Sequence, residues 1–150
     1  MRPRRHRTSL PDAPGAADDG QFDEARARTH AGAVADEVAA QIDAVHAVER
    51  GRQAFQPCAS CHQLGPSARA GFAPQLNGVI GRRAGSTPDY NYSEAMKKSG
   101  IVWSDATLAA FIKDPEGTVP GTRMRFFSLG YGERKIADLL AYLRTMPARP

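Results

Sequence analysis

The stretch Cys58-Ala59-Ser60-Cys61-His62 constrains this 150-residue sequence more than any other. Two thiols three positions apart can each add to one vinyl group of a haem, and the adjacent His62 can then ligate the iron. A redox disulfide with the same spacing needs a strand–helix setting, which the flanking sequence lacks. A zinc site needs further ligands, but the chain has only two cysteines. The motif therefore predicts one haem c, covalently attached through Cys58 and Cys61.

On the N-terminal side of this motif, apolar residues recur at steps of three and four. They predict an amphipathic helix that begins near residue 33 and ends before Pro57; its apolar positions are Val34, Val38, Ile42, Val45 and Val48. Residues 1–32 are rich in Arg, Pro, Gly, Ala and Asp, which predicts a disordered tail. We therefore expect a tail at 1–32 and a haem-binding domain at 33–150, with residues 33–47 as an added or extended N-terminal helix.

On the C-terminal side, Gly and Pro dominate residues 63–87 and predict a loop. A short helix is expected at 93–99, with Ser93 as its N-cap, and a second from the N-cap Ser104 to the break at Asp114-Pro115. After a further loop, a last helix is expected from Glu133 to Pro147, with apolar residues on one face. No strand of convincing length is found, so the fold class is all-α.

The charge is unevenly distributed along the chain. Residues 1–44 contain six Arg and eight Asp or Glu and so carry a net charge of −2. The rest of the chain carries +6, which gives the whole chain a net charge of +4. No run of Lys and Arg alternates with aromatic residues, so we expect no nucleic-acid partner. No segment approaches the roughly 20 apolar residues of a membrane span. The basic start of the chain is not followed by an apolar segment, so no signal peptide is visible.

From about Val48 to Met146 the chain resembles the class I cytochromes c, the group of mitochondrial cytochrome c and bacterial cytochrome c2. The matching segments follow in the family order with nearly the family spacing: Cys58–His62, Ala73–Arg82, Tyr90–Ser93, Gly100–Trp103, Pro120–Met124 and Asp138–Leu143. The resemblance implies a small class I cytochrome c fold of four to five helices around one haem.

A second axial ligand is needed if the iron is to cycle without binding a substrate. The sulfur candidates are Met1, Met96, Met124 and Met146. Met residues at helical spacing are more often core filler than ligands. Met124 lies in a Pro-Gly loop, where the resemblance implies the sulfur ligand, so we expect His62 and Met124 to hold the iron.

The resemblance also implies roles around the haem. The Pro74 carbonyl should accept the Nδ1 hydrogen of His62 and fix the ring. Hydrogen bonds to the haem propionates, or neutralisation of their charge, are implied for Arg82, Tyr90, Tyr92, Trp103 and Thr122. Phe111 stands where the family commonly has Tyr, and Met96 where it often has Asn, which implies a drier pocket.

The expected function is that of a monohaem carrier of single electrons in a respiratory or photosynthetic chain, and not that of an enzyme. Its partners would be electron donor and acceptor proteins in transient encounters, with the chain a monomer in the periplasm or, alternatively, the mitochondrial intermembrane space. Arg123 and Arg125 are candidate docking residues, whereas Glu116 falls where mitochondrial relatives carry lysine. The alternatives are a five-coordinate haem sensor or peroxidase, and a cytochrome subunit tethered to an oxidoreductase complex by its N-terminal helix.

Overall fold

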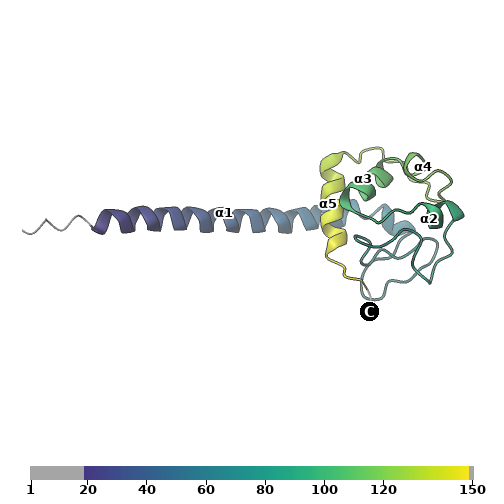
Figure 1. Cartoon of the computed structure of the whole chain (residues 1–150), viewed down its shortest axis with the longest axis horizontal. Coiled ribbons are helices and arrows are strands. Elements are labelled where there is room, and N and C mark those ends of the chain that lie inside the picture. Colours follow the sequence, from purple (N-terminus) through teal and green to yellow (C-terminus); the bar gives the residue numbers. More distant parts are fainter. Residues whose placement is uncertain (1–18, 149–150) are drawn as a thin grey trace, which may run out of the picture. The chain divides into compact units, whose positions relative to one another are not determined.

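The computed structural model describes residues 19–148, and side chains from residue 24 onward. Its helices are α1 (Asp19–Ala54), the 3-10 helix η1 (Cys58–Ser60), α2 (Glu94–Lys98), α3 (Asp105–Lys113), α4 (Pro115–Thr118) and α5 (Glu133–Arg144) (Figure 1). Within the described residues the only β pairing is an isolated antiparallel bridge between Arg83 and Val102. The all-α expectation is confirmed.

Helix α1 begins at Asp19, well before the expected start near residue 33. Residues 24–28, Glu-Ala-Arg-Ala-Arg, are strong helix formers and favour helix even without apolar periodicity. Of the expected tail, residues 1–18 lie outside the described residues, and 19–32 are helical. The chain divides into two units after Ala39, and we describe each by itself. The domain boundary at residue 33 stays a prediction.

The two serines expected as N-caps both cap helices. Ser93 Oγ accepts the amide hydrogen of Met96 at 3.2 Å, and Ser104 forms a reciprocal capping box with Thr107. Helix α4 lies where a loop was expected to begin. Asp114 caps it by accepting from Gly117 N at 2.9 Å, and Pro115 occupies its first turn. Four residues are too few for apolar periodicity to reveal such a helix.

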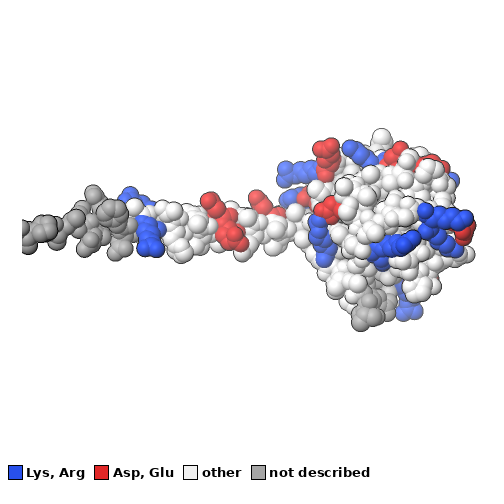
Figure 2. Space-filling view, viewed as in Figure 1, with Lys and Arg blue, Asp and Glu red and all other residues white. Residues whose placement is uncertain are grey.

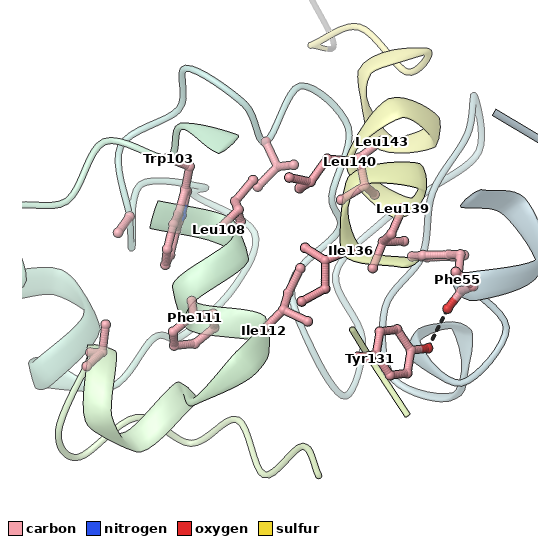
Figure 3. Close-up of a cluster of buried hydrophobic side chains, with 14 of the residues drawn as sticks. Phe55, Trp103, Leu108, Phe111, Ile112, Tyr131, Ile136, Leu139, Leu140 and Leu143 are labelled. Atoms are coloured by element: carbon pink, nitrogen blue, oxygen red, sulfur yellow. Dashed lines mark hydrogen bonds between the residues drawn. The ribbon is translucent and has the colours of Figure 1, made fainter. Parts of the chain in front are cut away.

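The hydrophobic core of the second unit lies between α3 and α5 and the end of α1 (Figure 3). Leu139 of α5 is its most deeply buried large side chain, with 1% of its surface exposed. Phe55 packs against Tyr142, with ring centroids 5.8 Å apart. The Tyr131 hydroxyl donates to the Ala54 carbonyl at 2.5 Å, which satisfies a carbonyl in the last turn of α1.

Polar contacts tie the end of α1 to α5. Arg50 Nε donates to Asp138 Oδ2 at 2.8 Å, across a sequence separation of 88 residues. Gly51 is buried against the same turn of α5, where the absence of a side chain permits close approach. These contacts fix the segment that leads directly into Cys58.

Candidate haem site

A pocket of about 330 Å³ opens in the second unit, and all eleven side chains expected to bind haem line it. They are Cys58, Cys61, His62, Pro74, Arg82, Tyr90, Tyr92, Trp103, Phe111, Thr122 and Met124. The remaining lining is mainly apolar and comes from η1, α2, α3, α5 and the loops between them. Segments distant in sequence therefore converge on one cavity.

His62 is held in a defined orientation. Its Nδ1 lies 2.8 Å from the Pro74 carbonyl oxygen, which can only accept, so Nδ1 carries the hydrogen. The other ring nitrogen, Nε2, then has a free lone pair when the ring is neutral, as a metal ligand requires. Burial lowers the pKa of His62, which favours the neutral ring.

Both cysteines are free thiols in the structure and are half-buried. The tight turn of η1 orders them: Cys61 N and His62 N both donate to the Cys58 carbonyl, at 3.1 and 2.9 Å. Burial raises the pKa of the Cys58 thiol. The turn therefore presents two unpaired thiols and an oriented imidazole to the same pocket.

Arg82 brings a positive charge to the pocket and is held there by backbone carbonyls. Its guanidinium donates to the carbonyls of Asn77 and Gln75, each at 3.0 Å. No Asp or Glu among the described residues forms an ion pair with it, and burial lowers its pKa. A half-buried guanidinium of this kind favours an anionic group nearby.

Three of the four other polar side chains expected at the propionates have hydrogen-bond partners in the protein. The Tyr92 hydroxyl pairs with Thr87 Oγ1 at 2.6 Å, and the Tyr90 hydroxyl donates to the Phe72 carbonyl at 3.3 Å. Thr122 Oγ1 accepts from Met124 N at 3.3 Å. Trp103 Nε1 has no hydrogen-bond partner among the described residues, and its ring packs against Phe111 at 5.1 Å.

Two methionines line the pocket. Met96 lies on α2 and is 8% exposed, whereas Met124 is half-buried in the loop after α4. The pocket therefore offers two sulfur atoms, and its lining alone does not select one. Met146 is absent from the lining, and Met1 lies outside the described residues.

Sequence reasoning missed several lining residues. Phe72 and Phe126 flank the predicted site, and Leu76, Val79 and Leu139 line it as well. Phe72 is 86% exposed although it lines the pocket. A lone large aromatic residue in a loop of Gly and Ala was the available signal for Phe72.

The residues present fit a covalently attached haem. The pocket combines an apolar lining for a porphyrin, two thiols for its vinyl groups, an oriented imidazole for its iron and the half-buried guanidinium of Arg82 for its carboxylates. An all-α domain with this site defines a c-type cytochrome. Residues 48–147 match the Cytochrome c family model, and the chain belongs to this family. It accordingly binds one haem c.

Known relatives agree with this assignment. A cytochrome c2 of Rhodomicrobium vannielii is 46% identical over 96 residues, which are 64% of this chain and 76% of that protein. A cytochrome c-550 of Bradyrhizobium diazoefficiens is 47% identical over 93 residues, or 62% and 68% of the two chains. The solved structure of cytochrome cH from Methylobacterium extorquens matches with a TM-score of 0.59 and 39% identity, over 65% of this chain and 97% of that one. The role that these similarities support is electron transfer.

Proposed function

We propose that this cytochrome carries electrons with low-spin iron held by His62 and Met124, in transient contact with donor and acceptor proteins. The proposal rests on the fact that both side chains line one pocket together with Cys58 and Cys61. Met124 is preferred to Met96 because it lies in the Pro-Gly loop where the family resemblance implies the sulfur ligand. When bound, haem c supplies an iron atom that accepts and releases one electron. A thioether ligand favours the ferrous state and so raises the reduction potential.

The protein's contribution is to hold its ligands still and to exclude water. The hydrogen bond from His62 to Pro74 fixes the imidazole, and Thr122 fixes the backbone of Met124. Phe111, 6% exposed, and Met96 add apolar surface to the same pocket. If His62 and Met124 both held the iron of a bound haem, no position on the iron would be left for a substrate, and electron exchange would be favoured over chemistry on a substrate.

For the cellular setting we propose a monomer that serves a respiratory or photosynthetic chain in the periplasm. The attached haem supports this proposal, because haem attachment to this motif takes place outside the bacterial cytoplasm in the family that the chain resembles. Among the described residues, no helix is long and apolar enough to span a membrane.

The test is the visible spectrum of the purified holoprotein, oxidised and reduced, for wild type, Met124→Leu and Met96→Leu. Sulfur ligation gives ferric haem a weak far-red band. We expect this band in wild type and Met96→Leu, and its loss in Met124→Leu. Loss in Met96→Leu alone would assign the ligand to Met96. A high-spin wild-type spectrum that shifts with carbon monoxide would instead favour the five-coordinate sensor or peroxidase.

A second candidate function, attachment to a larger oxidoreductase through α1, is favoured by the exposed surface of that helix. Val34, Val38, Ile42 and Val45 are each 48–67% exposed. Residues 29–49 include four Asp or Glu and no Lys or Arg, and acidic side chains stand out along α1 in Figure 2. A basic, apolar partner surface would fit such a helix. If a variant without residues 1–44 forms the same complexes as the full chain, this candidate fails.

A further inference from the structure

The loop that carries Met124 is held on both sides by one carboxylate. Glu116, in α4, accepts a hydrogen bond from Gly121 N through Oε1 at 2.9 Å. Its other oxygen, Oε2, accepts from Arg125 at 3.0 Å. Gly121 precedes Met124 by three positions and Arg125 follows it, so the carboxylate bridges the two sides of the loop.

The position of the Glu116 side chain is fixed by the short helix that carries it. Helix α4 is capped by Asp114 and starts with the buried Pro115, which places Glu116 in its first turn. The Gly121 amide, and then Arg125, hold the pKa of Glu116 below its usual value. Glu116 is therefore ionised at neutral pH and can accept both hydrogen bonds at once.

Two other side chains of the Met124 loop also make hydrogen bonds, but to acceptors or donors other than Glu116. Thr122 Oγ1 accepts from the amide of Met124 itself, and Arg123 donates to the Asn91 carbonyl at 2.8 Å. Each of these contacts holds one point of the loop. Among the described residues, Glu116 is the only side chain that holds the loop both before and after Met124.

We propose that Glu116 is a positioning residue for Met124 and sets how readily the sulfur leaves the iron. The inference rests on the proposed ligation by Met124. Without Glu116, the turn at Gly121 and the segment at Arg125 lose their common acceptor, so the loop opens more easily. An added ligand then competes better for the sixth position of the iron.

The expected size of the effect follows from exposure. Glu116 and Arg125 side chains are 55% and 71% exposed, so solvent screens their attraction. Loss of the hydrogen bond to Gly121 should weaken the hold on the loop by a further modest amount. We expect Glu116→Ala to raise the apparent affinity for imidazole roughly three- to tenfold, and Glu116→Gln, which keeps an acceptor for Gly121, about twofold.

The experiment titrates imidazole into the ferric holoprotein and follows loss of the far-red band. Glu49 supplies the control, because it is 52% exposed and accepts two hydrogen bonds from Arg52, at 3.0 and 2.8 Å, away from the Met124 loop. Glu49→Ala should leave the imidazole affinity at the wild-type value. Urea unfolding of each variant then separates opening of the loop from loss of global stability.

The outcomes distinguish the two proposals. The role of Glu116 is supported if the affinity for imidazole rises in the order wild type, Glu116→Gln, Glu116→Ala, while Glu49→Ala keeps the wild-type affinity. A wild-type far-red band with equal imidazole affinities in all four proteins overturns that role and leaves Met124 ligation standing. If the wild type lacks the band, both the proposed ligation and the role of Glu116 are wrong.

Discussion

The backbone of Gly51 in α1 lies directly against the backbone of Asp138 in α5, with no side chain between them. A Cβ at Gly51 would overlap the Asp138 carbonyl oxygen and would lie 2.7 Å from Tyr142 Cβ. The neighbouring Arg50 binds the carboxylate of the same aspartate. One turn of α5 thus makes both a close backbone contact and an ion pair with the helix that precedes the haem-binding motif.

Gly51→Ala should destabilise the holoprotein by about 1–3 kcal/mol, because the added methyl group meets backbone that cannot rotate away. The measurement is urea unfolding followed by Trp103 fluorescence. Gly32→Ala is the matched control, since Gly32 is also in α1 and its Cβ would have no atom within 4 Å. Equal midpoints for the two variants would contradict the close approach.

Asp138→Asn should lower the free energy of unfolding at neutral pH, because the charge of the ion pair with Arg50 is lost; the Arg50 side chain is 43% exposed, so solvent screens the attraction and the loss should be under about 1 kcal/mol. Hydrogen bonding by Arg50 holds the pKa of Asp138 below its ordinary value. Stabilisation by this pair is therefore complete above the unfolded pKa of about 3.9 and is lost as the pH falls through the folded pKa. The difference between wild type and Asp138→Asn should shrink in acid, and a constant difference from neutral to strongly acidic pH would rule this explanation out.

Tyr131→Phe should cost about 1–3 kcal/mol, since it leaves the buried Ala54 carbonyl without the hydroxyl that donates to it. The ring contact with Phe126, at 5.1 Å between centroids, would remain. Tyr142→Phe serves as the comparison, because the Tyr142 hydroxyl makes no hydrogen bond with the described residues. Thermal unfolding should separate the two variants, and identical stability loss would show that the Tyr131 hydroxyl is not important.

Arg82→Gln should lower the midpoint potential by roughly 30–60 mV, which for one electron is about a three- to tenfold change in the equilibrium constant. Removal of a half-buried positive charge relieves repulsion with the extra charge of ferric iron. A spectroscopic redox titration measures this shift. Arg83→Gln, on an exposed neighbouring side chain, should have a much smaller effect; the same shift in both variants would discount the buried charge.

Local signals in the sequence predict much of the fold. Ser93 and Ser104 mark the starts of α2 and α3 because a serine oxygen is the acceptor that a first helical turn needs. Helix α4 escapes prediction because four residues show no period. The early start of α1 is not predicted, because residues 19–32 form helix without an apolar stripe.

The site is predictable to a different degree. Spacing reveals Cys58, Cys61 and His62, and family resemblance points to the hydrogen bond from His62 to Pro74 that the structure contains. The hydrogen bond between the Tyr92 hydroxyl and Thr87 depends on how the loop that contains both residues folds, and no local sequence pattern predicts this. For the same reason, the sequence shows Glu116 only as an acidic residue where mitochondrial relatives carry lysine. In the structure its carboxylate bridges both sides of the Met124 loop.

The 88-residue separation of Arg50 and Asp138 has a consequence for the order of events during biogenesis. A contact of such long range closes late, because most of the chain must be synthesised before its second partner exists. The cysteines of residues 58–62 emerge near the beginning of that interval, in an open chain where both thiols are accessible. Covalent attachment of the cofactor can therefore precede closure of the domain, so that the chain folds around a group it already carries.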